Sequence, residues 1–356
     1  MAESLDLRRR LGLAVSGKLR AQAVREHPLQ QLFWECTLRC NLHCRHCGSD
    51  CKASSVVRDM PYKDFAKVLD SVAARTDSHK VFVIFTGGEP LMRPDIESCV
   101  ADVFRRGFPS GMVTNGIALT EARLSRLIDA GLHTMTISLD GLEDTHDWMR
   151  QVPGGFKRTV NAIEAAAHSA LVDFDVVTCV TARNYSQLPV IKDLLAASGV
   201  RKWRLFTVFP VGRAAGDPEM KLDREQARGL MEFIKECRKE GKVHASFGCE
   251  GFLGNYEGEV RDHFFFCQAG IFVGSVLADG SISACSSIRS GYSQGNIYRD
   301  DFMDVWENRF AVYRDHSWMK TGKCEDCKFW KHCLGNGMHL RDSEGNLLLC
   351  NMEQLA

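Results

Sequence analysis

The most constraining feature of this sequence is an alternation of strand-like and helix-like segments between residues 31 and 210. The strand-like segments are rich in Val, Ile, Phe, Thr or Trp and cover residues 31–37, 80–86, 111–114, 134–140, 173–181 and 203–209. The intervening stretches repeat apolar residues at helical spacing, as in Ile96, Cys99, Val100, Val103 and Phe104. This alternation predicts a parallel sheet with right-handed crossovers. Six units predict an α/β fold, a partial (β/α)6 TIM-like barrel, with its chemistry at the carboxyl ends of the strands.

Composition divides the chain into four regions. We expect residues 1–30 to form a helical extension that packs on the barrel rather than on a membrane. Residues 31–215 should form the barrel, and residues 216–244 should form a linking helix. From residue 245 onward the helical periodicity is lost, while Gly, Cys and aromatic residues become frequent. Residues 245–356 are therefore expected to form a cysteine-rich C-terminal domain.

The charge balance and the cysteine content narrow the function classes. Lys plus Arg and Asp plus Glu both number 45, so no global charge points to nucleic acid or to an anionic membrane. The N-terminus lacks the apolar run of a secretion signal, and the apolar run 81–85 is far too short to span a bilayer. The 15 cysteines are clustered rather than dispersed. We therefore expect a cytoplasmic protein whose clustered thiolates bind metal rather than form disulfides.

Three cysteines crowd the loop after the first predicted strand. They are Cys40, Cys44 and Cys47, within the stretch WECTLRCNLHCRHCGSDC. An iron–sulfur cube needs one ligand per iron, so three cysteines would leave one iron open to another ligand. Two alternatives remain from the spacing alone: a set of unrelated thiols, or a zinc knuckle completed by His43, His46, Cys36 or Cys51.

The CxxxCxxC spacing, together with three later motifs at successive strand ends, resembles the radical S-adenosylmethionine (SAM) superfamily. The motifs are TGGEP at 86–90, TNG at 114–116, and SLDG at 138–141, the last followed by HDWMR. "PVGRA" at 210–214 also resembles a segment found near the SAM site in such enzymes. The resemblance implies that His46, in place of the usual Tyr or Phe, lies near adenine. It further implies SAM contacts from Gly87, Gly88, Glu89, Pro90, Asn115, Ser138, Asp140 and Arg150, with the two glycines allowing close backbone approach to the ligand.

The resemblance also implies a reaction type. A [4Fe–4S] cluster on Cys40, Cys44 and Cys47 would bind SAM through its amino and carboxylate groups. One electron would then split the sulfonium into methionine and a 5′-deoxyadenosyl radical, which removes a hydrogen atom from the substrate. No catalytic residue beyond the cluster is predicted. A flavodoxin- or ferredoxin-type protein is the expected electron donor.

The cysteines of the C-terminal region resemble the SPASM extension, which carries auxiliary [4Fe–4S] clusters. One site is complete in this sequence, comprising Cys324, Cys327, Cys333 and Cys350. A second is incomplete, with Cys267 and Cys285, because Gly337 stands where the family has a cysteine. Cys249 is a possible third ligand of this second site, since the family often uses a cysteine upstream of the first motif position. This second site could be an open cluster, a cluster with a replacement ligand such as His339, or no cluster. A zinc ribbon on the complete set is the alternative.

The auxiliary cysteines favour an enzyme that modifies a peptide or protein side chain, because radical SAM enzymes acting on small metabolites often lack them. The alternative is a haem-biosynthetic or other cofactor-tailoring enzyme with the same two-part layout. A zinc-binding interaction protein on an α/β scaffold is the non-enzymatic alternative. Neither nucleic acid nor a membrane span is expected.

Overall fold

The computed structural model describes residues 5–248, 251–288 and 291–356, and one ten-stranded sheet organises them. Its strand order is β10-β9-β8-β1-β2-β3-β4-β5-β6-β7, and strands β1 to β7 pair in parallel. The strands are β1 Gln31–Thr37, β2 Phe82–Gly87, β3 Ser110–Thr114, β4 Thr134–Ser138, β5 Asp173–Val180, β6 Lys202–Thr207, β7 His244–Phe247, β8 Val273–Val276, β9 Ser281–Ser283 and β10 Gly295–Asn296. All six predicted barrel strands are present.

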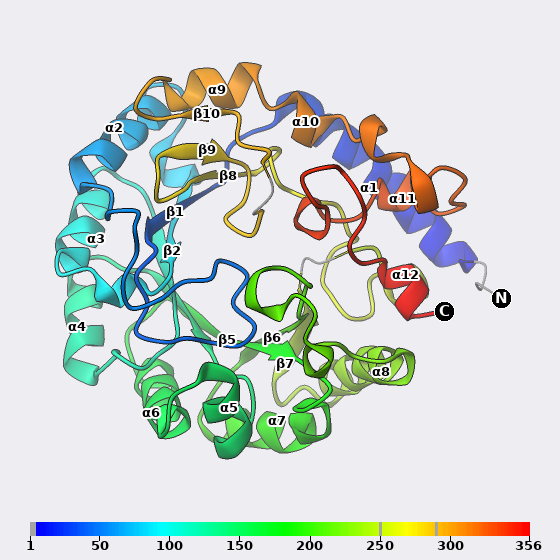
Figure 1. The fold of residues 1–356 in the computed structure, drawn as a ribbon, viewed down its shortest axis with the longest axis horizontal. Helices are drawn as coiled ribbons and strands as arrows, with labels where there is room; N and C mark the ends of the chain where they lie inside the picture. Colours follow the sequence, from blue (N-terminus) through cyan, green and yellow to red (C-terminus); the bar gives the residue numbers. More distant parts are fainter. Residues whose placement is uncertain (1–4, 249–250, 289–290) are drawn as a thin grey trace.

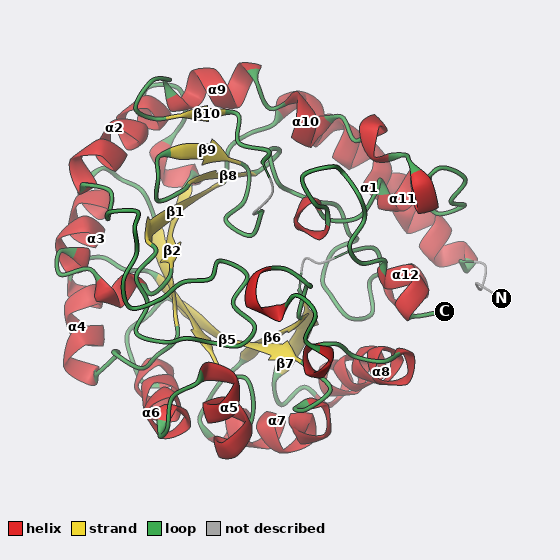
Figure 2. Ribbon diagram, viewed as in Figure 1, coloured by secondary structure: helices red, strands yellow, loops and turns green. Residues whose placement is uncertain are grey.

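The sheet curves into an open, partial barrel with its helices on the outside (Figure 1). Each crossover between neighbouring parallel strands contains a helix, as the alternation predicted. The outer helices are α2 Tyr62–Ala73, α3 Ile96–Arg105, α4 Glu121–Asp129, α5 Glu143–Arg150, α6 Gly155–Ala167, α7 Leu188–Ala197 and α8 Arg224–Glu240. Figure 2 shows the contrast between this layered part and the loop-rich C-terminal region.

The sheet continues into the C-terminal region, which the sequence analysis did not anticipate. Strand β8 pairs in parallel with β1, so residues far apart in the sequence are neighbours in one sheet. Strand β7 extends the opposite edge by pairing with β6. Both strands have four residues, and β8 reads VGSV, too short to show a clear alternation. The barrel and the C-terminal region are thereby joined through backbone hydrogen bonds.

The core between β1 and the outer helices is built on aromatic stacking. Trp34 on β1 is fully buried and stacks on Phe65 of α2, with ring centroids 4.4 Å apart. The guanidinium of Arg93 lies 5.0 Å from the Trp34 ring and donates hydrogen bonds to the carbonyls of Cys36 and Met60, at 2.8 and 3.0 Å. This packing fixes the end of β1, from which the three-cysteine loop departs.

The N-terminal helix α1, Leu7–Glu26, packs on the C-terminal region and not on the barrel as expected. Its buried Leu13 belongs to an apolar cluster with Phe252, Phe265 and Phe329. The C-terminal region also contains the helices α9 Phe302–Asn308, α10 Ala311–Arg314, α11 Trp330–Cys333 and α12 Asn351–Gln354. Within the described ranges, no helix combines the length and the apolar character that crossing a bilayer requires.

We predict that Trp34→Ala lowers the free energy of unfolding by about 3–5 kcal/mol, because it removes a fully buried ring and leaves a cavity beneath the end of β1. The shift in the urea midpoint, measured anaerobically, checks this. Val172→Ala is the control: its side chain is 77% exposed, so its effect should stay within about 0.5 kcal/mol. Equal effects of the two substitutions would contradict the packing described here.

Candidate functional site

The three-cysteine loop closes over the carboxyl ends of β1 to β4. Its backbone is held by hydrogen bonds from Cys40 N to the Lys52 carbonyl, 2.7 Å, and from Cys47 N to the Cys44 carbonyl, 3.3 Å. A cavity of about 140 Å³ lies beneath it. The predicted site residues that line this cavity are Cys40, Cys44, His46, Cys47, Gly87, Gly88, Glu89, Asn115, Ser138 and Arg150. The structure thus brings together ten residues drawn from four separate motifs.

The three thiols experience different electrostatic environments. Burial raises the pKa of Cys40 to about 12. Burial also raises the pKa of Cys44, and the positive charge of Arg150 opposes this increase. Arg150 Nη1 donates a hydrogen bond to Cys44 Sγ at 3.7 Å. A hydrogen bond with the Cys51 side chain is the largest cause that lowers the pKa of Cys47, to about 5. Buried thiols of high pKa ionise when a metal takes the place of the proton. The donor set therefore suits a metal centre.

Gly87 and Gly88 pack the end of β2 against the start of the three-cysteine loop. Gly87 has φ +137°, and a Cβ on either glycine would overlap a backbone carbonyl oxygen, of Thr37 or of Arg39. Gly88 N donates to the Thr37 carbonyl at 2.7 Å, and Glu89 N donates to the Arg39 carbonyl at 2.9 Å. The physical reason for the glycines is thus the close approach of two protein backbones, in addition to the expected access for a ligand.

Glu89 links the ends of β2 and β3. Its buried carboxyl group accepts hydrogen bonds from Thr114 Oγ1 and Asn115 N, both at 2.8 Å, and from Leu91 N at 3.1 Å. Asn115 in turn donates from Nδ2 to Asn41 Oδ1 at 2.8 Å, with Cys40 Sγ at 3.9 Å. Pro90 begins the 3₁₀ turn Pro90–Met92 and is absent from the cavity lining.

Asp140 lies behind the cavity wall rather than in it. Its Oδ2 is 2.5 Å from Arg150 Nη2 and 3.6 Å from His46 Nε2, while its Oδ1 accepts a hydrogen bond from Cys179 N at 2.8 Å. Burial lowers the pKa of His46 to about 4, so the imidazole is neutral at pH 7. Asp140 therefore orients Arg150 and His46, and these two side chains face the cavity.

Arg213, which was not among the predicted site residues, holds the three-cysteine loop through hydrogen bonds to three of its carbonyls. Its Nε donates to the Cys44 carbonyl at 2.7 Å and its Nη1 to the Cys51 carbonyl at 3.1 Å, while its backbone N donates to the Cys47 carbonyl at 3.0 Å. Arg213 lies within "PVGRA", so the sequence predicted that it lies near the SAM site but did not predict its hydrogen bonds to the three-cysteine loop. Asn184, which donates to the Asp140 carbonyl at 2.8 Å, had no such signal.

The cysteines of the predicted complete auxiliary site, Cys324, Cys327, Cys333 and Cys350, line a second cavity of about 440 Å³ in the C-terminal region. Burial raises the pKa of Cys333 to about 12, and the negative charges of the other three thiols raise it further. Buried Arg341 donates to Cys324 Sγ at 3.4 Å and to the Gly335 carbonyl at 3.1 Å. Four convergent thiols and one buried cation suit an anionic metal–sulfur centre.

The predicted second auxiliary site is represented by two thiols. Cys267 and Cys285 are half-buried. The pKa of Tyr313 is raised to about 12, mainly by burial, and the charges of these two thiols also raise it. Cys249 lies outside the described residues. His339, suggested as a replacement ligand, packs its ring edge-on against Phe209, with centroids 5.0 Å apart, and burial lowers its pKa to about 4.

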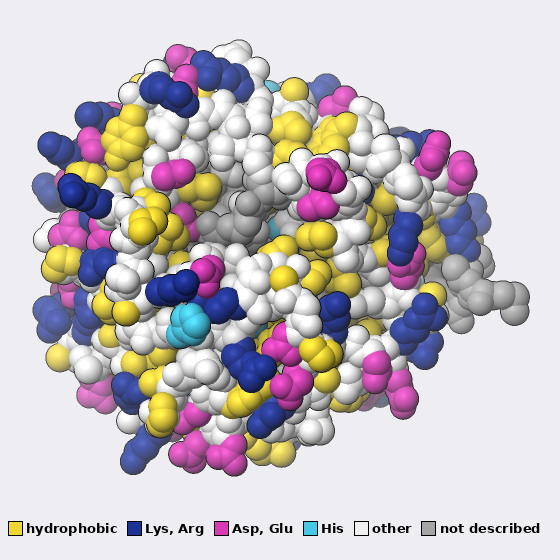
Figure 3. Space-filling model, in the orientation of Figure 1, with side chains coloured by type: hydrophobic (Ala, Val, Ile, Leu, Met, Phe, Trp, Pro, Cys, Tyr) yellow, Lys and Arg dark blue, Asp and Glu magenta, His cyan; other side chains and the backbone are white. Residues whose placement is uncertain are grey.

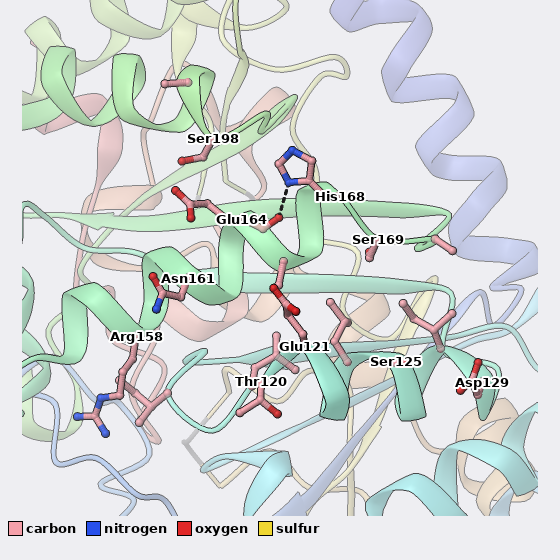
Figure 4. Close-up of a pocket in the computed structure, with 17 residues that line it drawn as sticks. Thr120, Glu121, Ser125, Asp129, Arg158, Asn161, Glu164, His168, Ser169 and Ser198 are labelled. Carbon is pink, nitrogen blue, oxygen red and sulfur yellow. Dashed lines mark hydrogen bonds between the residues drawn. The ribbon is translucent and has the colours of Figure 1, made fainter.

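A larger cavity, about 1050 Å³, lies elsewhere, on the outside of the barrel (Figure 4). It is bordered by α4 and α6, and its labelled side chains are mixed in charge, among them Glu121, Asp129 and Arg158. His168 Nδ1 makes a 2.8 Å hydrogen bond with the carbonyl of Glu164 on its own helix. No cysteine lines this surface cleft. Its size therefore does not make it the reaction site.

Two protein families match this chain. Residues 34–194 match the radical SAM superfamily, and residues 267–328 match the SPASM family, described as an iron–sulfur cluster-binding domain. The chain belongs to the radical SAM superfamily. The matches cover the three-cysteine loop, its strand-end motifs and the first part of the C-terminal cysteine set. This radical SAM enzyme therefore uses SAM and [4Fe–4S] clusters, in a partial barrel followed by a SPASM-type domain.

Relatives extend the match over almost the whole chain. The AdoMet-dependent heme synthase of Methanosarcina barkeri is 29% identical over 326 residues, which is 85% of this chain and 90% of that protein. The mycofactocin maturase MftC of Mycolicibacterium smegmatis is 27% identical over 86% of this chain and 77% of that protein. The solved structure of native anSMEcpe with bound AdoMet has a TM-score of 0.70 at 17% identity, over 91% and 94% of the two chains. That structure supports the fold alone.

We predict that Gly88→Ala displaces the three-cysteine loop, because the new Cβ would overlap the backbone of Arg39. The variant should retain its auxiliary iron but lose most of the iron bound at Cys40, Cys44 and Cys47, which is about four atoms per chain. Iron and sulfide analysis after anaerobic reconstitution measures this loss. Gly17→Ala on α1 is the matched control, since no atom lies within 4 Å of its added Cβ. Full iron loading of the Gly88 variant would contradict the packing argument.

We predict that Cys333→Ser removes about four irons per chain from the auxiliary site, because this thiol lines the same cavity as three others. Iron content and the absorbance of the reconstituted protein report the loss. Cys237→Ser on α8 replaces another buried cysteine that belongs to neither set, so its iron content should match that of the unmodified protein. A loss of only one zinc atom in the Cys333 variant would instead indicate a zinc ribbon.

Proposed function

We propose that this radical SAM enzyme acts on a small molecule, an iron tetrapyrrole of haem biosynthesis, rather than on a peptide. The observation that carries the proposal is the match to an AdoMet-dependent heme synthase over 85% of this chain and 90% of that protein. This choice reverses the preference that the auxiliary cysteines suggested, since this chain covers 90% of the heme synthase and 77% of the mycofactocin maturase. A cytoplasmic location belongs to the same proposal.

Each cysteine set has one role in this proposal. Cys40, Cys44 and Cys47 hold the cluster that binds SAM, while Cys324, Cys327, Cys333 and Cys350 hold an auxiliary cluster. When bound, cluster and SAM supply a 5′-deoxyadenosyl radical that removes a hydrogen atom from the substrate.

The surrounding residues hold SAM and limit its exposure to water. Arg150, kept in place by Asp140, provides a buried guanidinium for the SAM carboxylate. Neutral His46 offers a planar face for adenine. Arg213 holds the segment after β6 over the three-cysteine loop, so that the small cavity beneath is covered. The positions of Arg150, His46 and Arg213 around one cavity support these proposed roles.

Peptide maturation is the second candidate, and a specific observation favours it. Mycofactocin maturase aligns with 86% of this chain, at 27% identity. The alignment with this chain covers 77% of the maturase, whereas it covers 90% of the heme synthase. The two candidates share the radical chemistry and differ in the substrate alone, so an assay with a defined substrate separates them.

We predict that the anaerobically reconstituted enzyme, given SAM, a strong reductant and iron coproporphyrin III, forms 5′-deoxyadenosine well above the rate without porphyrin. Mass spectrometry should show a porphyrin product of altered mass. Cys44→Ala should abolish both readouts because it removes a cluster ligand. A porphyrin-independent rate combined with an unchanged porphyrin mass would overturn the tetrapyrrole proposal, and a mass change on a peptide encoded nearby would establish the second candidate.

A further inference from the structure

Helix α1 is fixed to the molecule by one face. Arg20 donates hydrogen bonds to the carbonyls of Lys331 and His332, at 3.1 and 3.0 Å, and Arg9 pairs with Glu259 at 2.6 Å. Gly12 lies against the Phe264 ring so closely that a Cβ would overlap it. With Leu13 buried in an apolar cluster, these contacts set the rotation of the helix about its axis. The opposite face is therefore held outward.

The outward face carries a continuous apolar stripe. Leu7, Leu11, Val15 and Leu19 follow one another at four-residue spacing, and each is 61–70% exposed. At 1.5 Å per residue the stripe is about 18 Å long. Among the described residues, nine large apolar side chains are more than half exposed, and four of them belong to this one helix. Scattered exposed apolar residues are ordinary, but a linear array on one helix face indicates a contact surface.

The same helix is strongly cationic. Arg8, Arg10, Lys18 and Arg25 are all exposed, and none has an ion pair within the described ranges. At 100° per residue, Arg8, Lys18 and Arg25 project on the same side as the stripe. Glu26 is the one acidic residue of α1. An exposed helix face that combines aliphatic side chains with unpaired cations is complementary to a lipid surface, in which anionic headgroups cover apolar acyl chains.

We propose that α1 attaches this enzyme peripherally to an anionic lipid surface, with the stripe inserted at the headgroup boundary and Arg8, Lys18 and Arg25 on lipid phosphates. The helix lies in the plane of the interface and does not span the bilayer, which accords with the absence of a spanning helix in the described residues. A second copy is a poorer partner, because stacking two α1 faces would bring their cations together. Helix α1 lies at the edge of the molecule, near α10 and α11 (Figure 1). This proposal is independent of the substrate.

Vesicle co-sedimentation of the reconstituted enzyme tests the proposal. We expect binding to vesicles of phosphatidylcholine mixed with phosphatidylglycerol, and at least about tenfold weaker binding to phosphatidylcholine alone or at high salt. The combined variant Leu7→Gln, Leu11→Gln, Val15→Gln and Leu19→Gln should lose at least about tenfold in affinity, since it removes the apolar stripe while keeping a good helix former. The charge variant Arg8→Gln, Lys18→Gln and Arg25→Gln should lose the preference for anionic vesicles.

A matched control replaces exposed apolar residues elsewhere. Val172→Gln and Val190→Gln, both more than half exposed and outside α1, should bind vesicles as the unmodified enzyme does. Unchanged iron content and SAM cleavage by the stripe variant would show that its fold is intact. The proposal is overturned if the unmodified enzyme does not bind anionic vesicles, or if the stripe variant binds equally well. It is also overturned if light scattering shows a dimer that the stripe variant abolishes, because the stripe then serves a second copy.

Discussion

The close approach of two backbones, at the ends of β1 and β2, is the constraint on which the site depends. Gly87 and Gly88 let β2 meet residues 37–39 without a Cβ between them, and two hydrogen bonds join the segments there. The three-cysteine loop begins at this junction. Its position relative to the neighbouring strand ends is therefore set by main-chain geometry, which tolerates little displacement. A cluster held by only three protein ligands needs such a support, because no fourth thiolate fixes it.

A second layer of support is electrostatic. Arg150 contacts Cys44 on one side and the buried carboxylate of Asp140 on the other, so a single cation links a thiol to the end of β4. A buried pair of this kind contributes less to stability than to fixing one arrangement. Burial of the Cys40 and Cys44 thiols costs free energy if they ionise alone. The geometry thus becomes favourable when a metal centre is bound, which couples cluster binding to the order of the loop.

The sequence predicted the six barrel strands and the grouping of the cavity residues because both follow from local patterns. Runs of β-branched residues indicate strands, and motifs at successive parallel strand ends must meet at one edge. It could not assign Asp140 to a position behind Arg150, since that depends on which side chain lies nearer the cavity. It missed β8 because four residues reading VGSV acquire strand geometry only by pairing with β1. The packing of α1 on Phe252 and Phe265 likewise depends on tertiary contacts that periodicity does not contain.

The pairing of β8 with β1 has a consequence for the two proposed metal centres. Strand β1 leads directly into the three-cysteine loop, and β8 lies between Cys267 and Cys285 in the sequence. A hydrogen-bonded ladder therefore connects the segment that leads to Cys40, Cys44 and Cys47 to the segment that carries Cys267 and Cys285. A flexible linker would let the C-terminal region drift relative to the barrel, whereas a ladder within one sheet fixes their separation. Electron transfer and substrate confinement both depend on fixed distances, so the proposed role of the cysteine-rich region in a reaction at the mouth of the barrel requires such a connection.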